Sequence, residues 1–172
     1  MPLLKSGAFV EDGFVTLGAD DAVPAEGDII LPFDRFIAEF DTLKLRPSRL
    51  GVVFPVAGDL DALKAVLFRL DAIVLPFAAF TDGRAFSLAR IIRTRFGFSG
   101  ELRSAGPIIP DQIAFLRQVG FDAFEVNSNR HGRETWIKAA TAMTLTYQKG
   151  FLPKRGFAPV DVFEARQARS GS

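Results

Sequence analysis

Residues 80–126 read FTDGRAFSLARIIRTRFGFSGELRSAGPIIPDQIAFLRQVGFDAFEV, alternating polar turns with hydrophobic segments of regular spacing. The spacing predicts a helix from Arg84 to Phe96, a strand from Glu101 to Ala105 and a helix from Pro110 to Gln118. Phe121 to Val126 is a further predicted strand. This stretch therefore alternates helix and strand twice.

The same alternation begins earlier in the chain. Leu50 to Pro55 and Ala72 to Pro76 are short apolar runs, typical of strands buried on both faces. Between them, Asp59 is a predicted N-cap, and a helical stripe follows it: Leu60, Leu63, Leu67 and Leu70. With a last helix predicted from Glu134 to Thr146, four βα units favour right-handed crossovers and a mainly parallel sheet. We expect an α/β fold, either a partial (β/α) barrel or a small open sheet.

The rest of the chain is expected to flank this core. The expected parts are an N-terminal arm of the same domain (1–49), the βα core (50–149) and an extended C-terminal arm (150–172). Within the first part we predict short strands at Phe14 to Leu17 and Asp28 to Leu31, and a helix from Pro32 to Phe40. Because a partial barrel or small open sheet leaves strand edges exposed, we expect a homodimer.

Composition excludes several classes of function. The 172 residues are 48% apolar, with 21 Lys and Arg against 20 Asp and Glu, so no global field attracts nucleic acid or an anionic membrane. With no Cys and one His, we expect no disulfide, no metal centre and no iron–sulfur cluster. No apolar run approaches the roughly 18 residues of a membrane span, and the first residues lack a signal-peptide core. We therefore expect a cytoplasmic, soluble protein.

Polar turns follow the predicted strands at their carboxyl ends, where ligands of parallel α/β folds gather. We predict a site for a small oxyanion or carboxylate there, made by Thr81, Asp82, Gly83, Arg84, Arg103 and Gln112. Arg84, Arg103 and Arg133 are expected to converge near helix N-termini. In a purely structural alternative, Asp82 is an N-cap and Arg84 pairs with Glu101 or Asp111.

Signals for catalysis are weaker. Asp82, Glu101 and Asp111 are weak candidates for a general acid or base, because no spacing identifies a pair. His131 is expected to be a solvated loop residue, and Arg93 is expected outside the apolar face of its helix. The chain has neither a dinucleotide-binding fingerprint nor a phosphate-binding loop, so no cofactor is evident.

These motifs resemble DUF934, a family of uncharacterised bacterial proteins often encoded beside sulfite reductase and described as oxidoreductases of sulfite reduction. The matching positions are Thr81 to Arg84, Ser87, Ala89-Arg90, Gly100 to Arg103, Gly106, Asp111-Gln112, Gly120 to Asp122 and Tyr147-Gln148. The chain departs from the pattern at Ala78, Ala85-Phe86, Pro107 and Val119. A chemical role that the family assigns to Pro107 or Val119 would be lost here.

The resemblance implies a setting in assimilatory sulfur metabolism. Because the chain shows no resident electron carrier, we predict an accessory protein of sulfite reduction. It would bind an oxyanion or the reductase through the Asp82-Gly83-Arg84 face. The alternative is an enzyme, an oxidoreductase of sulfur metabolism that uses an external cofactor, with the same face as its substrate site. Both alternatives stay open at this point.

Overall fold

The computed structural model describes residues 2–79 and 83–142, together with the backbone of 145–146 and 160–161. One eight-stranded sheet has the order β2-β1-β8-β7-β6-β5-β4-β3. Its strands are β1 (Leu3–Lys5), β2 (Ala8–Val10), β3 (Phe14–Thr16), β4 (Asp28–Pro32), β5 (Leu50–Val53), β6 (Ala72–Pro76), β7 (Glu101–Ala105) and β8 (Ala123–Glu125). Neighbours from β3 to β8 are parallel, whereas β1 is antiparallel to both β2 and β8.

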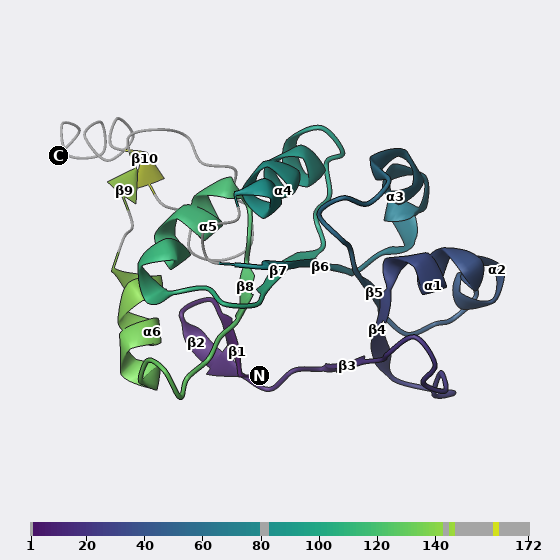
Figure 1. Ribbon diagram of the computed structural model, residues 1–172, viewed down its shortest axis with the longest axis horizontal. Helices are drawn as coiled ribbons and strands as arrows, with labels where there is room; N and C mark the ends of the chain where they lie inside the picture. Colours follow the sequence, from purple (N-terminus) through teal and green to yellow (C-terminus); the bar gives the residue numbers. More distant parts are fainter. Residues whose placement is uncertain (1, 80–82, 143–144, 147–159, 162–172) are drawn as a thin grey trace, which may run out of the picture.

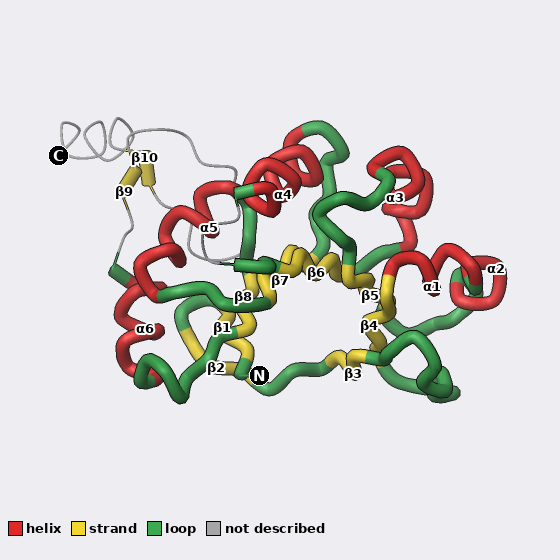
Figure 2. Tube along the Cα trace, in the orientation of Figure 1, coloured by secondary structure: helices red, strands yellow, loops and turns green. Residues whose placement is uncertain are grey.

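The helices lie around the outside of this curled sheet (Figures 1 and 2). They are α1 (Phe33–Ala38), α2 (Phe40–Leu43), α3 (Leu60–Val66), α4 (Arg84–Thr94), α5 (Ile113–Val119) and α6 (Arg133–Thr141), with 3-10 turns η1 (Leu67–Arg69) and η2 (Pro110–Gln112). The protein is thus a mixed α/β half-barrel with alternating strands and helices. No helix in the described ranges is long and apolar enough to cross a membrane.

The sheet is larger than the four βα units expected from the sequence, because the first 32 residues add β1 to β4. Strands β2 and β3 stand at opposite ends of the strand order, yet they are consecutive in the chain. Residues 11–13 join them, so the chain itself crosses the open side of the half-barrel (Figure 2). The short strand predicted from Phe14 to Leu17 is confirmed as β3, which ends at Thr16.

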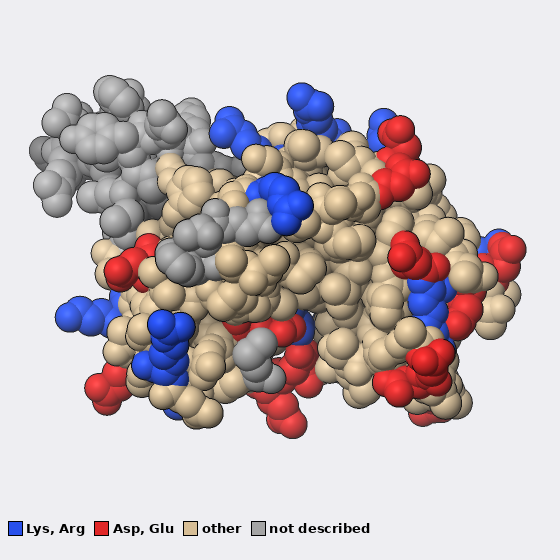
Figure 3. Space-filling model, viewed as in Figure 1, with Lys and Arg blue, Asp and Glu red and all other residues tan. Residues whose placement is uncertain are grey.

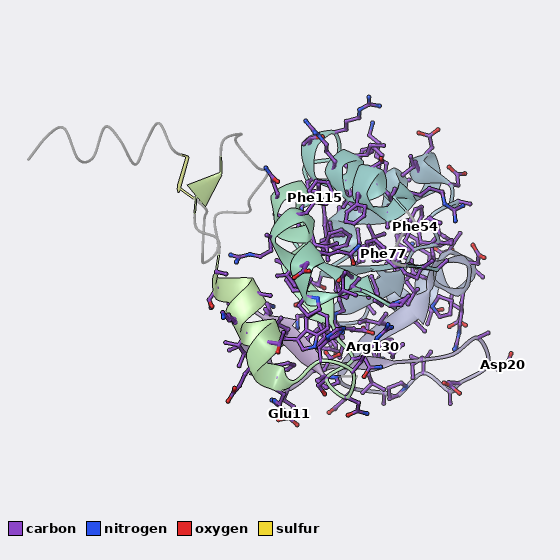
Figure 4. All side chains as sticks on the ribbon, turned by 60° about the vertical axis from the view of Figure 1, so that its left-hand side comes forward. Glu11, Asp20, Phe54, Phe77, Phe115 and Arg130 are labelled. Atoms are coloured by element: carbon purple, nitrogen blue, oxygen red, sulfur yellow. The ribbon has the colours of Figure 1, made fainter. Side chains whose placement is uncertain are left out.

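The main hydrophobic core fills the space between the sheet and the helices. Phe54 and Phe77, labelled in Figure 4, belong to it, as does the fully buried Trp136 of α6. Asp59 caps α3 as predicted, since its carboxylate accepts the N–H groups of Asp61 and Ala62. The leucine stripe of α3 and η1 packs against this core, and for this reason its residues recur at helical spacing in the sequence.

The concave face of the sheet carries a second and smaller apolar cluster, formed by Phe14, Ile30, Ala72 and Val74. Gly51 lies between two of these strands, and a Cβ there would come within 2.8 Å of Ile30. In register with Val74, the next strand presents Arg103 to the same concave face. The concave face of the half-barrel is therefore apolar at β3, β4 and β6 and charged from β7 onward.

Several sequence predictions need correction. Helix α6 ends at Thr141 and not at Thr146, because residues 145–146 form β9 (Leu145–Thr146), which pairs with β10 (Val160–Asp161). Arg93 is fully buried rather than outside the apolar face of α4. The β1–β2 hairpin was not anticipated. Apart from β10, the predicted arm at 150–172 lies outside the described residues.

Candidate functional site

A buried arginine organises the charged part of the half-barrel interior. Arg103 donates to both carboxylate oxygens of Asp12 at 2.6 and 3.0 Å, and to Glu101 through two N–H groups at 2.8 and 3.0 Å. Its remaining bond reaches Glu125 at 3.4 Å, so all five guanidinium N–H groups have acceptors. We call Lys5, Asp12, Glu101, Arg103 and Glu125 the interior network. Figure 3 shows acidic side chains gathered near the middle of the visible face.

The interior network holds Asp12 and Glu101 in the ionised form. Burial alone would raise the pKa of Glu101, but hydrogen bonds from Lys5 and Arg103 outweigh it and lower that pKa. The pKa of Asp12 is lowered in the same way, chiefly by Arg103 against the effect of burial. Glu101 is therefore a charge partner, and its depressed pKa gives no support to its predicted role as a general acid.

The described members of the predicted oxyanion site do not form one cluster. Thr81 and Asp82 lie outside the described residues, while Gly83 and Arg84 begin α4 at the carboxyl edge, where strands β3 to β8 end. Arg103 instead points from the middle of β7 into the interior, so the expected convergence on helix N-termini is wrong for it.

The remaining predicted residues divide between the two ends of the sheet. Gln112 ends η2 at the carboxyl edge, and its side-chain oxygen accepts the N–H of Ile109. Asp111 is exposed in the same turn. Glu101 starts β7 at the opposite edge and pairs with Lys5 and Arg103, so it does not pair with Arg84.

Two helices start in the same way at the carboxyl edge. Helix α4 begins Gly83-Arg84 and α6 begins Gly132-Arg133, and no side chain in the described ranges caps either N-terminus. The first N–H groups of a helix have no partner within it and attract anions, whereas a cation in the first turn is disfavoured. Helix α4 also has no acidic residue in its first turn, although α6 has Glu134. Among the described residues, the start of α4 therefore concentrates positive potential, whereas Glu134 offsets part of it at the start of α6.

His131 and Trp136 pack together at the start of α6, with ring centroids 5.8 Å apart and the rings nearly perpendicular. They occupy the positions before the N-cap and one turn into the helix, the arrangement of a staple. His131 thus lies in a loop as the sequence suggested, but it is half-buried rather than fully solvated. The Nε2 atom of His131 and the Nε1 atom of Trp136 are buried and find no hydrogen-bond partner in the described part of the chain.

A polar pocket of about 630 Å³ opens at the other end of the sheet, the amino edge. Its lining includes Arg49, Asp71, Glu101 and Asp122, which stand just before or at the start of β5, β6, β7 and β8. Lys5 joins them because β1 runs antiparallel to β8 and ends at this edge. The described structure therefore contains polar groups at both edges of the sheet.

Two hydrogen bonds fix the carboxylate of Asp122 in this pocket. One carboxylate oxygen accepts the N–H of Leu102 at 2.8 Å, and the other accepts the buried Arg93 at 3.0 Å. Arg93 also donates to the backbone carbonyls of Phe98, Gly100 and Gly120, so it joins α4 to the strands on either side of α5. Burial raises the pKa of Asp122 to about 6 despite the opposing charge of Arg93.

A family comparison covers most of this architecture. The model of a bacterial family of unknown function matches residues 51–157, which is more than half of the chain. The chain belongs to DUF934. The match begins within β5 and includes Arg93, Arg103 and Asp122, whereas Lys5 and Asp12 come from outside the matched residues. No curated protein matches the chain.

Sequence reasoning missed several important side chains of this DUF934 protein. Asp12 reaches Arg103 across 91 positions, and no local pattern reveals that pairing. The burial of Arg93 could have been predicted, because Arg93 continues the helical stripe of Ala85 and Ala89 at intervals of four residues. Asp122 was noted only as part of a motif, and its role depends on the burial that Arg93 and β7 impose.

We expect the Asp122 carboxyl to titrate near pH 6, with Arg93, Glu101 and Lys5 as the charged groups that influence it. Because its pKa is raised above the reference value of 3.8, the contribution of Asp122 to stability should fall as pH rises from about 4 to about 6. The loss is up to about 3 kcal/mol. Carbon-13 NMR of the carboxyl groups checks this: a midpoint near 6 should disappear in Asp122→Asn, and the absence of any such midpoint would contradict it.

Proposed function

We propose that this DUF934 protein is an accessory protein of assimilatory sulfite reduction that binds a small oxyanion at its carboxyl edge. The observation that carries the proposal is the pair of helices that begin Gly83-Arg84 and Gly132-Arg133 with no capping side chain among the described residues. The metabolic setting rests on the resemblance described above. The binding chemistry rests on helix N-termini and guanidinium groups, which favour sulfite, sulfate or phosphate.

The buried Trp136 N–H supports an acceptor ligand at the start of α6. An indole N–H that loses water without gaining an acceptor costs about 1–3 kcal/mol. An oxyanion oxygen or a water molecule bound beside it would remove that cost. Arg133 is already ordered nearby, because its guanidinium lies 4.2 Å from the centre of the Phe9 ring. The first turns of α6 therefore carry both a donor that is unsatisfied among the described residues, at Trp136, and a positioned cation, at Arg133.

Thermal unfolding with sulfite, sulfate or phosphate, against chloride at equal ionic strength, tests this binding. At ten times the dissociation constant a ligand adds about 1.4 kcal/mol, which corresponds to roughly 3–6 °C for a chain of this size. We expect Arg84→Gln or Arg133→Gln to lose at least roughly half of that shift. Arg90→Gln is the matched control, because Arg90 is exposed on α4 away from its first turn. Equal shifts in all four proteins would indicate a general salt effect and contradict the proposal.

The accessory role is tested separately from oxyanion binding. We expect the purified chain to form a complex with sulfite reductase in analytical ultracentrifugation and to leave sulfite unchanged when assayed alone. Turnover of sulfite by the isolated chain would contradict an accessory role. If the chain binds the oxyanion but forms no complex with the reductase, it is an oxyanion-binding protein and its assignment to sulfite reduction is wrong.

A further inference from the structure

The amino-edge pocket lies at the opposite end of the sheet from the carboxyl edge where the oxyanion is proposed to bind. Five charged residues line it: Lys5, Arg49, Asp71, Glu101 and Asp122. Phe14 and Leu70 add an apolar part to the same lining. A ligand that fits this lining needs positive, negative and apolar groups together.

The charged side chains retain capacity for a ligand. Lys5 donates one of its three N–H groups to Glu101 at 2.6 Å, and its side chain is 42% exposed. Arg49 is paired with Asp28 at 2.6 Å and stacks 4.6 Å from the Phe14 ring centre, which fixes its position while half of it stays exposed. Both cations are therefore held in place without being enclosed.

The carboxylates are similarly placed but not saturated. One oxygen of Asp71 accepts the N–H of Leu50 and lies 3.6 Å from the guanidinium of Arg69. Asp122 accepts one hydrogen bond on each oxygen, from Leu102 and from Arg93. Each carboxylate oxygen has two lone pairs, so both residues can accept a further donor. Asp71 stands directly before β6 and Asp122 directly before β8, on either side of β7.

The size of the pocket narrows the ligand class. About 630 Å³ lies within the range of roughly 300–1,000 Å³ usual for small-molecule sites and greatly exceeds one oxyanion. A purely anionic ligand would meet three carboxylates, and a purely cationic one would meet Lys5 and Arg49. A molecule that carries both charges can satisfy both sets of groups.

We propose that the amino-edge pocket binds a small zwitterionic molecule of the amino-acid class, its ammonium group on Asp71 and Asp122 and its carboxylate on Lys5 and Arg49. The apolar part of the ligand contacts Phe14 and Leu70. An ammonium group beside Asp122 favours the ionised carboxylate, so ligand binding lowers the pKa of Asp122 from about 6. Binding therefore strengthens as pH rises from 5 to about 7.

The test is nitrogen-15 NMR of the full chain with each of the twenty common amino acids as the probe, at about 5 mM. We expect at least one amino acid to move the amide signals of Ser6, Asp71, Gly100 and Asp122 with saturation. The amine-only and acid-only analogues of that amino acid should each bind roughly tenfold more weakly, the effect of one lost charged contact of about 1.4 kcal/mol.

Lys5→Gln and Asp71→Asn remove one cation and one carboxylate from partly exposed positions and are expected to weaken binding by at least roughly fivefold. Lys138→Gln, at an exposed position on α6, is the matched control and should bind like the wild type. The proposal is overturned if no amino acid moves the pocket amides, or if either pocket variant binds as the control does. Amide signals that move with sulfite at the starts of α4 and α6 report on the oxyanion site, so the two proposals are tested by different signals.

Discussion

Arg103→Met should destabilise the protein by about 3–5 kcal/mol at pH 7, the usual loss when one partner of a buried ion pair is removed. Arg103 is fully buried, and without it Asp12, Glu101 and Glu125 keep only Lys5 as a cation in the interior network. Because Asp12 lies in the segment that joins β2 to β3, the same change releases the chain that crosses the open side of the half-barrel. Urea denaturation measures the loss.

The pH dependence of that loss identifies its cause. The pKa values of Asp12 and Glu101 are lowered in the folded protein, so their contribution to stability is present above about pH 4 and is lost as pH falls further. The deficit of Arg103→Met should therefore shrink below about pH 4. Arg90→Met, at an exposed position on α4, should stay within about 0.5 kcal/mol of the wild type. A deficit below about 1 kcal/mol for Arg103→Met would contradict the role of the interior network.

Gly106→Ala should cost about 3 kcal/mol or more, because two independent effects coincide at this position. Its φ of +113° is rarely adopted by residues with a Cβ, and an added methyl group would meet the Phe77 carbonyl oxygen closer than non-bonded atoms approach. Gly106 follows β7 directly, and Phe77 follows β6. The substitution therefore forces two neighbouring strand ends apart at the carboxyl edge.

Two further glycines separate those effects. Gly97 has a positive φ of +68° with nothing within 4 Å of an added Cβ, so Gly97→Ala should cost only about 1–2 kcal/mol. Gly132 has open space and no positive φ, and Gly132→Ala should cost less than about 1 kcal/mol. Thermal denaturation of the three variants gives the ranking. If Gly106→Ala ranks with Gly132→Ala, the close packing of the two strand ends is wrong.

Local patterns predicted the central part of the fold well. The apolar runs that form β5 and β6 can be recognised without knowing their partner strands. Asp59 and the leucine stripe that follows it predict α3 from about a dozen consecutive residues. The hairpin of β1 and β2 was overlooked, although Ser6-Gly7 between two short runs is a turn signal, with φ of 52° and 80°. Helix α6 was predicted too long because no Gly or Pro marks its end.

The two edges of the sheet were harder to predict, because they depend on long-range geometry. The alternation of strands and helices correctly indicated that Arg84 and Gln112 would lie at the carboxyl edge. The same reasoning misplaced Arg103, since a charged residue inside a strand is visible in the sequence but its direction is not. Which face it takes follows from register with Val74, and its partner Asp12 comes from the loop that crosses the half-barrel.

The most direct measurement of the central claim is a nitrogen-15 NMR titration of the chain with sulfite, matched against sodium chloride at equal ionic strength. Oxyanion binding at the carboxyl edge predicts saturable shifts of the amides at the start of α4, Arg84 and Ala85, and at the start of α6, Arg133 and Glu134. Arg84→Gln should weaken the first set and Arg133→Gln the second. Shifts that grow without saturation, or that match those with chloride, would contradict the claim.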